Sequence, residues 1–342
     1  MAATPRILVI RNDKLGDFML AWPALASLRK NLPKSHIAVL VPSYTEDLAE
    51  ACDYVDEVVV DPGLKGDWKN GRALAELLKP MKFDAVITLF SRFDTGYGVW
   101  SAGIPLRYAP ATKLAQFFYN KRMTQRRSRS EKPEYEYNLD LVHAFLADQG
   151  VRKPKSVEPP YLKFKPADTK KLKQRFLKKH KIASAKKLVF VHPGHGGSAS
   201  NLSVLQYAEL VRKLAASKKL HFVLSAGPGE EAHAHRLASM VGSKVPNCVY
   251  ASEDGLAAFA GHLQFADLFI SGSTGPLHLA AALGVPTAAF YPRRRSATAL
   301  RWQTVNPPKE RLAFMPPEGA AESDMSRIDI RVAATDIAKR LL

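Results

Sequence analysis

Asp17 is the first residue whose type and position could do chemistry. The apolar run at residues 7–10 indicates a buried strand, and a short polar turn then leads through Gly16 and Asp17 into a helix. Ligands of an open parallel sheet bind beyond the carboxyl ends of its strands, which is where a general base would act. The alternative is a plain helix cap, because Asp is also favoured at helix starts.

Glycine-rich turns follow three strand-like runs in the second half of the chain. The first turn, HPGHGGS, contains His192, Gly194 and Ser198. Its glycines let backbone N–H groups approach a phosphate, and Ser198 adds a hydroxyl donor. The turn lacks the GK[ST] of a P-loop and the GxGxxG of a dinucleotide fingerprint, so a tight structural turn is the alternative.

The second turn, SAGPGEE, delivers Glu230 to a helix start just past a strand. A carboxylate in that position can accept hydrogen bonds from ribose hydroxyls. It can equally cap its own helix, and the sequence does not decide between the two roles.

The third turn leads from a strand into a helix with a proline in its first turn. Exposed N–H groups and the positive end of the helix dipole there predict a diphosphate site. His278 follows one turn into the helix, as a phosphate donor or as a packing residue. The stretch comprises Ser273, Thr274, Gly275, Pro276, Leu277 and His278. The spacing of the histidines predicts no metal site.

A run of basic residues at 121–132 lies between two groups of aromatic residues. It has no apolar periodicity, so we expect a mobile loop that clamps a phosphorylated acceptor or a lipid surface. A solvated surface loop is the alternative. The candidate acceptor-binding residues are Lys14, in the turn before Asp17, and Lys121, Arg122, Arg126, Arg127 and Arg129.

The elements that must position these residues alternate between strand and helix in both halves. Such alternation predicts right-handed βαβ crossovers and parallel sheets, an α/β fold of two doubly wound domains. A Lys- and Pro-rich stretch at 151–186 indicates the linker. We predict an N-terminal domain at 1–160, a C-terminal domain at 161–325, and a C-terminal helix at 326–342 that packs back on the first domain.

Composition narrows the class of protein. A length of 342 residues suits two domains, and a net charge of +18 favours an anionic partner. The two cysteines cannot build a disulfide framework, so we expect a reducing cytoplasm. The N-terminal apolar run is too short for a signal peptide, and no run is long enough to span a membrane, so we expect only peripheral membrane contact.

The motifs together resemble those of a known family. RILVIRNDKLGDFMLAWPAL, HPGHGG, SAGPGEE and DLFISGSTGPLHLAAALGVPTAAFY occur in order and with suitable spacing over most of the chain. In this combination the chain resembles glycosyltransferase family 9, the heptosyltransferases of lipopolysaccharide inner-core synthesis. The resemblance implies a GT-B architecture, in which two Rossmann-like domains face a central cleft.

The resemblance also implies an activity and roles for residues. It implies inverting, metal-independent transfer of heptose from ADP-heptose to a phosphorylated lipid A core at the inner face of the cytoplasmic membrane, with no cofactor. Asp17 would be the general base, Glu230 would hold the ribose, and Thr274 to His278 would bind the diphosphate. His192, Gly194, Ser198 and Ser273 complete the predicted nucleotide-sugar site.

Two departures from the family pattern leave the donor sugar open. Ser273 stands where many members have Asp, and Ser200-Asn201-Leu202 stands where many have a Lys-containing stretch. Basic residues after the last strand could replace that charge; they are Arg293, Arg294, Arg295 and Arg301. The alternatives are a transferase with another nucleotide-sugar or acceptor, and a non-catalytic nucleotide-sugar or nucleic-acid binding protein. The basic run contains no interleaved stacking aromatics, so we expect no nucleic-acid partner.

Overall fold

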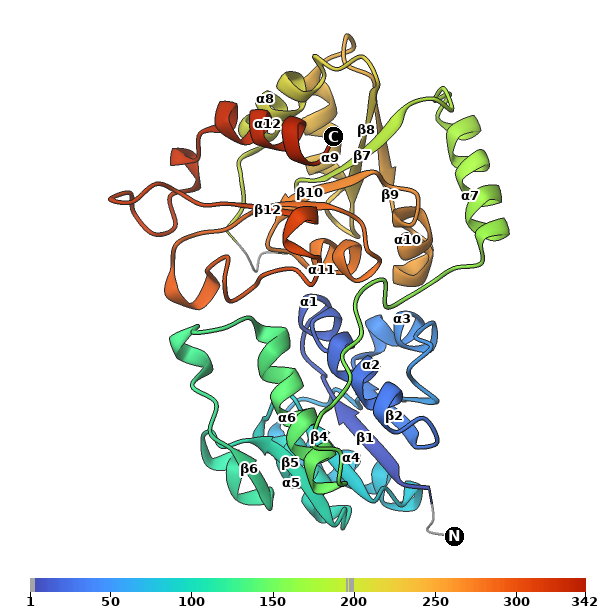
Figure 1. The fold of residues 1–342 in the computed structure, drawn as a ribbon, viewed down its shortest axis with the longest axis vertical. Coiled ribbons are helices and arrows are strands. Elements are labelled where there is room, and N and C mark those ends of the chain that lie inside the picture. Colours follow the sequence, from blue (N-terminus) through green and yellow to red (C-terminus); the bar gives the residue numbers. More distant parts are fainter. Residues whose placement is uncertain (1–3, 195, 197–199) are drawn as a thin grey trace. The chain divides into compact units, whose positions relative to one another are not determined.

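The computed structural model describes residues 4–194, 196 and 200–342, which form two compact units. The first unit runs to Arg127 and resumes at Glu131–Tyr161, and the second consists of Ser128–Ser130 and Leu162–Leu342. The chain crosses between them after Tyr161, next to the boundary predicted after residue 160. Each unit is a parallel sheet flanked by helices (Figure 1).

The first unit is built on a six-stranded sheet in the order β3-β2-β1-β4-β5-β6. Its strands are β1 (Arg6–Ile10), β2 (His36–Val41), β3 (Glu57–Val60), β4 (Ala85–Thr88), β5 (Leu106–Pro110) and β6 (Lys121–Met123). Its helices are α1 (Leu15–Met19), α2 (Trp22–Asn31), α3 (Glu46–Glu50), α4 (Asp67–Leu78), α5 (Phe93–Ser101) and α6 (Glu134–Asp148), with the 3₁₀ turns η3 (Leu114–Phe118) and η4 (Arg127–Arg129).

The second unit repeats this topology in the order β12-β11-β10-β7-β8-β9. Its strands are β7 (Lys187–His192), β8 (Leu220–Ala226), β9 (Asn247–Ala251), β10 (Leu268–Gly272), β11 (Thr287–Phe290) and β12 (Arg311–Phe314). Its helices are α7 (Pro166–Lys179), α8 (Val204–Leu214), α9 (Glu231–Val241), α10 (Gly255–Leu263), α11 (Gly275–Ala282) and α12 (Ile330–Arg340).

Both strand orders are those of the dinucleotide-binding fold, which confirms the predicted doubly wound α/β class. Each sheet reverses its winding between two adjacent central strands, β1 and β4 in the first unit and β7 and β10 in the second. The carboxyl ends of these strand pairs are therefore the positions at which such folds bind ligands.

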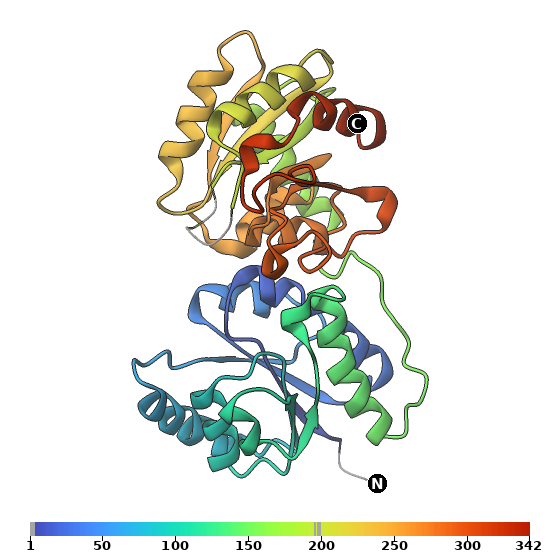
Figure 2. The same cartoon turned by 90° about the vertical axis from the view of Figure 1, so that its left-hand side faces the viewer.

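The helices cover both faces of the first sheet. Leu8 and Ile10 of β1 pack in one apolar cluster with Leu74 of α4 and Val99 of α5. Helices α2 and α6 pack against each other on the other face (Figure 2). Strands with both faces covered must be apolar throughout, and residues 7–10 of β1 are all at most 1% exposed.

The helix predicted after β1 is divided in two. The apolar spacing continues from Leu15 to Leu32, but α1 ends at Met19 and α2 begins at Trp22. Pro23 lies in the first turn of α2, where its missing N–H costs no hydrogen bond. Pro23 therefore marks the start of a second helix and does not kink a single long one.

Three expectations are wrong. The basic run is not simply a mobile loop, because residues 121–123 form β6 and pair in parallel with β5. The stretch at 151–186 is not a linker throughout, because helix α7 within it buries Phe176 against Phe190 and Phe265 of the second unit. The C-terminal helix was expected to return to the first domain, but α12 buries its apolar face in the core of the second unit, on α8. That face consists of Ile330, Ala333, Ala334 and Ile337.

Candidate functional site

Asp17 lies in the first turn of α1, directly beyond the carboxyl end of β1. Its carboxylate accepts a hydrogen bond from Nη2 of Arg11, and its side chain is 13% exposed. Lys14 is the N-cap residue of α1, so the alternative of a plain cap at Asp17 is wrong. The short helix instead holds the carboxylate at the winding reversal of the first sheet.

Arg11 is the cation around which this end of the sheet is organised, and its side chain is only 3% exposed. Besides Asp17, it donates through Nε to Asp13 at 2.9 Å and through Nη1 to Glu134 at 2.9 Å and Asn138 at 3.1 Å. A buried guanidinium requires such partners, because an unpaired charge in the interior is very costly. Three carboxylates thus converge on one arginine.

The pKa of Asp17 is raised to about 6. Burial is the largest cause, the negative charges of Asp13 and Glu134 raise the pKa further, and the guanidinium of Arg11 opposes them. Asp17 is therefore ionised at neutral pH, yet it is a stronger base than an ordinary aspartate. This combination suits a carboxylate that must take a proton from a hydroxyl.

Asn12 is a polar residue of this site that the sequence analysis missed. Its side chain donates to Asp61 and, at 3.5 Å, to Thr95, whereas its buried Oδ1 has no hydrogen-bond partner among the described residues. An unpaired buried acceptor is uncommon, and a ligand hydroxyl would satisfy it. Its one signal in the sequence was its position two residues after a buried strand.

The predicted acceptor-binding residues are dispersed. Lys14 is exposed at the start of α1, whereas Lys121 pairs with Asp148 at 2.8 Å on the edge strand. Arg127 donates to Glu134 at 2.6 Å and lies over the ring of Tyr137, with 5.6 Å to its centroid. Arg122, Arg126 and Arg129 are exposed. Arg127 and Arg11 therefore share Glu134 as a partner, and this carboxylate connects Arg127, a predicted acceptor-binding residue, to Arg11.

In the second unit, Glu230 joins the turns that follow β7 and β8. It accepts the N–H of Gly196 at 2.8 Å and that of Gly227 at 3.3 Å, and Nε2 of the buried His192 lies 3.3 Å from its Oε2. The contact with His192 and these N–H groups lower the pKa of Glu230 to about 2. Glu230 is the N-cap residue of α9, but its carboxylate makes no capping hydrogen bond to that helix and instead accepts from the two turns.

Gly194 is required by this arrangement. A Cβ at residue 194 would overlap the Glu230 carboxylate, so only glycine permits its close approach to the turn after β7. A carboxylate oxygen can accept two hydrogen bonds, which leaves Oε1 of Glu230 capacity beyond the N–H of Gly196. The predicted residue Ser198 lies outside the described residues.

The turn after β10 leaves the amino end of α11 open. Thr274 is its N-cap residue, but the Thr274 hydroxyl lies 3.0 Å from the hydroxyl of Ser271 and makes no capping hydrogen bond. Helix N–H groups without a cap, together with the helix dipole, favour an anion at this end. Pro276 lies in the first turn of the helix, and Ser273 and Gly275 are partly exposed beside it.

His278 and Leu277 lie deeper than the other residues of this stretch. Both are buried, and Nδ1 of His278 has no hydrogen-bond partner among the described residues. Burial lowers the pKa of His278 to about 4, so the ring is neutral at pH 7. Any contact of this ring with a diphosphate would be a hydrogen bond and not an ion pair.

Asn201, noted in the sequence only as a departure from the family pattern, ties the two turns together. Its Nδ2 donates to the carbonyls of Pro193 and Gly194, both at 3.1 Å, and its Oδ1 accepts from the hydroxyl of buried Tyr207 at 2.6 Å. A Cβ at Gly272 would lie 2.5 Å from the same Oδ1. Asn201 therefore fixes the turn after β7 against the end of β10.

The four arginines expected to supply positive charge have different surroundings. Arg293 pairs with Glu318 at 3.1 Å, and Arg294 and Arg295 are exposed. Arg301 is buried over the ring of Trp302, and that ring lies 6.4 Å from the ring of His278. Of the four, Arg301 is thus the one linked to α11 by these ring contacts.

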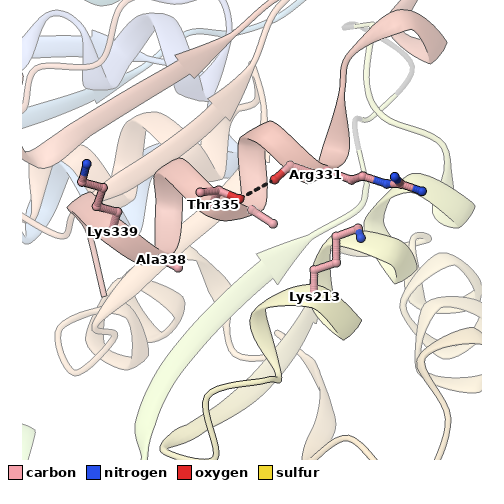
Figure 3. Close-up of a pocket in the computed structure, with 6 residues that line it drawn as sticks. Lys213, Arg331, Thr335, Ala338 and Lys339 are labelled. Carbon is pink, nitrogen blue, oxygen red and sulfur yellow. Dashed lines mark hydrogen bonds between the residues drawn. The ribbon is translucent and has the colours of Figure 1, made fainter.

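A hollow of about 580 Å³ between α8 and α12 lies outside these loops (Figure 3). Lys213 of α8 and Arg331 of α12 extend toward one end of it, and Thr335 donates to the carbonyl of Arg331 at 2.9 Å. A second hollow of about 560 Å³ is lined by residues of α7 and of the segment 264–267. Neither hollow is lined by a predicted site residue.

The described part of the chain holds neither a cluster of metal-ligating side chains nor a helix that could span a membrane. Within residues 4–194, 196 and 200–342, no three His, Cys, Asp or Glu side chains gather as metal ligands would. None of the helices described is both long and apolar enough to cross a bilayer.

Comparison with known proteins agrees with this architecture. The model of glycosyltransferase family 9 (heptosyltransferase) matches residues 71–310. A Haemophilus influenzae protein named "Putative glycosyltransferase" is 47% identical over 323 residues, which cover 94% of this chain and 92% of that protein. The fold and the two sets of strand-end loops thus define a glycosyltransferase of two Rossmann-like units, and the chain belongs to glycosyltransferase family 9.

Solved structures share the fold. The family 9 glycosyltransferase of Veillonella parvula superimposes with a TM-score of 0.81 at 18% identity, covering 98% of this chain and 97% of that one. The E. coli ADP-heptose lps heptosyltransferase II superimposes with a TM-score of 0.76 at 17% identity, covering 98% of each chain. These matches confirm the predicted fold class, and the family model and the Haemophilus influenzae relative confirm the family resemblance.

Proposed function

We propose that the protein is an inverting heptosyltransferase that transfers heptose from ADP-heptose to a phosphorylated lipid A core, with Asp17 as the general base. Membership of family 9 supports the transferase class. The E. coli protein of the same fold is an ADP-heptose lps heptosyltransferase, which supports an ADP-heptose donor and a lipopolysaccharide acceptor. A lipid acceptor implies work at the inner face of the cytoplasmic membrane.

The pairing of Asp17 with buried Arg11 is the observation that carries the proposal. In the proposed step, Asp17 takes the proton of an acceptor hydroxyl while the hydroxyl oxygen bonds to the anomeric carbon and the bond from that carbon to the diphosphate breaks. Attack on the face opposite the leaving group inverts the anomeric carbon. Proton transfer to a positioned base contributes about 10²–10⁴-fold to such a rate.

The second unit would hold the donor. The free capacity of Glu230 Oε1 suits a ribose hydroxyl, and the uncapped amino end of α11 suits the diphosphate. Charge builds on the diphosphate as it leaves, and fixed N–H donors stabilise that charge without reorganisation. Arg301 is the candidate for added positive charge, since its contacts lead to α11 through Trp302.

The decisive experiment compares Asp17→Asn with Asp13→Asn in a transfer assay with ADP-heptose and a lipid A core acceptor. Both variants remove one carboxylate charge from the partners of Arg11. We expect Asp17→Asn to lose about 10²–10⁴-fold in kcat with unchanged ADP affinity, and Asp13→Asn to retain most of its activity. Transfer by Asp17→Asn at the wild-type rate would show that Asp17 is not the base.

A related transferase with a different donor is the second candidate, and the serine at position 273 and the Ser200-Asn201-Leu202 stretch favour it. A thermal-shift panel of ADP, UDP and GDP separates the two, because a ligand that binds the native state stabilises it. Stabilisation by ADP alone supports ADP-heptose. If UDP or GDP raised the melting temperature more than ADP did, the donor would not be ADP-heptose. The role of Asp17 could still be tested with the same two variants.

A further inference from the structure

The first unit exposes an unusual group of large apolar side chains, which we call the aromatic face. It consists of Trp68 of α4, Trp100 of α5, and Leu114 and Phe117 of η3. Their exposed fractions are 58%, 51%, 72% and 71%, respectively. Single exposed apolar residues are ordinary, but a group of this size marks an interaction surface.

Ring contacts connect the exposed tryptophans to each other. Trp68 contacts Phe93 at 4.9 Å and Tyr97 at 5.0 Å between ring centroids. Phe118 of η3 contacts Phe93 at 5.3 Å and Trp100 at 5.9 Å. Three of these contacts are edge-to-face and the one between Trp100 and Phe118 is tilted, and rings at such separations attract one another. The aromatic face therefore rests on a packed layer and is not a set of loose side chains.

Glycines in the two helices allow this layer to form. A Cβ at Gly71 of α4 would lie 2.7 Å from Cδ1 of Tyr97, and a Cβ at Gly98 of α5 would lie 2.9 Å from Cδ2 of Leu74. A Cβ at Gly96 would lie 3.0 Å from Phe118. Glycine inside a helix is destabilising relative to alanine, so these positions are explained by the close approach of α4, α5 and η3.

The geometry of η3 directs two of the apolar side chains to the same side. Residues three apart coincide along a 3₁₀-helix, which aligns Leu114 with Phe117. Lys113 precedes this pair and is itself exposed. An exposed cation beside protruding apolar groups is the arrangement by which proteins anchor at a membrane interface.

Charge favours a bilayer as the occupant of this surface. Residues 95–123 contain Arg107, Lys113, Lys121 and Arg122 and no acidic residue, and of these Lys121 pairs with Asp148 at 2.8 Å. Lys69 and Arg72 are exposed on α4 near Trp68, where Asp67 and Glu76 balance them. The net charge of the chain is +18, which complements anionic lipid headgroups. Tryptophan is also enriched at the boundary between lipid and water.

We propose that the aromatic face docks the protein onto an anionic phospholipid bilayer, with its apolar side chains inserted among the headgroups. The helices that carry this face, α4 and α5, lie together on one side of the first sheet (Figure 2). The sequence led us to expect membrane contact at the basic run, residues 121–132. We now place the apolar side chains that enter the membrane on α4, α5 and η3. It extends the proposed function, in which the acceptor is a lipid, but vesicle binding can be measured without donor or acceptor.

Co-sedimentation with vesicles tests the proposal on the full chain. The vesicles contain phosphatidylcholine alone or phosphatidylcholine mixed with the anionic lipid phosphatidylglycerol, to which basic residues are attracted. The test variant is Trp100→Ser/Phe117→Ser. The matched control, Leu205→Ser/Val332→Ser, removes side chains of the second unit that are 63% and 55% exposed. Thermal unfolding and gel filtration verify that each variant is folded.

We expect the wild type and the control to bind the anionic vesicles equally and the test variant to bind at least tenfold more weakly. Binding to phosphatidylcholine alone should be weaker for every protein, and 0.5 M salt should reduce binding to anionic vesicles. The proposal would be overturned if the wild-type protein did not bind anionic vesicles. It would also be overturned if the test and control variants lost vesicle binding equally. A test variant that changes only the oligomeric state would show that this face joins two copies of the chain.

The two proposals fail separately. Transfer to a soluble, delipidated acceptor should be unchanged in Trp100→Ser/Phe117→Ser, because neither residue belongs to the candidate site. A wild type that binds vesicles but transfers no sugar would contradict the proposed function alone. A wild type that transfers sugar but does not bind vesicles would contradict the docking surface alone.

Discussion

Nη1 of Arg11 donates a hydrogen bond to Oε1 of Glu134 across 2.9 Å, and the two side chains are only 3% and 1% exposed. Glu134 begins α6, whereas Arg11 follows β1, so the bond joins parts of the chain 123 residues apart. The same guanidinium holds Asp17. The candidate base is therefore positioned by a buried ion cluster and not by its own short helix alone.

Replacing Arg11 should destabilise the first unit strongly. Arg11→Met keeps much of the side-chain volume but leaves carboxylates buried without their cation, which typically costs about 3–5 kcal/mol. Urea unfolding followed by tryptophan fluorescence measures this loss, since Trp22, Trp68 and Trp100 all lie in the first unit.

The matched control is Lys132→Met, which removes a cation whose pair with Asp140 is about one-third exposed on each side. Exposed pairs contribute about 0–1 kcal/mol, so the control should change little. Equal destabilisation by the two substitutions would contradict the central place of Arg11.

The pH dependence of kcat/KM should report Asp17. Its pKa of about 6 means that transfer rises with pH through about 6 and is level above, because only the carboxylate can accept the proton. In Glu134→Gln, one of the negative charges that raise the pKa of Asp17 is gone. In this variant, the pH at which kcat/KM is half-maximal should be lower than in the wild type. An unchanged midpoint would show that Glu134 does not affect the pKa of Asp17.

Asp17 should also affect stability with pH in a defined direction. A folded-state pKa raised from 3.8 to about 6 means that the folded protein holds this proton more tightly than the unfolded chain. The resulting stabilisation is complete below pH 3.8 and is lost as the pH rises through 6. Asp17→Asn should therefore be at least as stable as the wild type at pH 7.5, as measured by urea unfolding. A clear loss of stability at that pH would indicate that Asp17 is mainly a structural partner of Arg11.

Strongly apolar strands made much of the fold predictable. The runs that become β1, β2, β7 and β8 are buried on both faces, so their sequences are apolar without alternation. The edge strand β6 is only three residues long and reads Lys-Arg-Met. Charged residues protect a sheet edge from pairing with another chain, and the same charges conceal the strand in the sequence.

The candidate site was predictable only in part. Asp17 and Glu230 follow strand ends, and that position can be inferred from the sequence. The partners Arg11 and Glu134 could not be paired, because a contact between residues 123 apart depends on where α6 packs. The signal for Arg11 was present, since an arginine directly after a buried strand needs carboxylates around it. Asn201 gave no such signal, because its role depends on Gly272 and Tyr207.

Glu230→Gln should weaken the second unit and its binding of ADP. The lowered pKa of about 2 means that the ionised carboxylate stabilises the fold above pH 4.5, and this contribution is lost as the pH falls toward 2. After discounting for solvent screening we expect a loss of about 1–2 kcal/mol at pH 7. ADP affinity should fall about tenfold by calorimetry, which corresponds to about 1.4 kcal/mol.

The adjacent Glu231→Gln is the control, because Glu231 accepts only the N–H of Gly229, at 3.2 Å, in the hydrogen bonds described here. Its ADP affinity should stay near that of the wild type. The pH profile near 6 should be the same in both variants, since it belongs to Asp17. If Glu231→Gln also lost ADP affinity about tenfold, the cause would be the negative charge near α9 and not a specific contact of Glu230.

A double-mutant cycle between Gly272 and Asn201 tests how the donor loops are fixed. Gly272→Ala places a methyl group 2.5 Å from Oδ1 of Asn201, and Asn201 cannot move without losing its bonds to Pro193 and Tyr207. We expect Gly272→Ala to cost about 1–3 kcal/mol, as for other overpacked sites, and to weaken ADP binding. In the background of Asn201→Ala, the methyl group has room, so the same substitution should cost less than half as much. Additive effects in urea unfolding would show that the two residues do not restrain each other, and the close approach of the β7 turn to β10 would then need another cause.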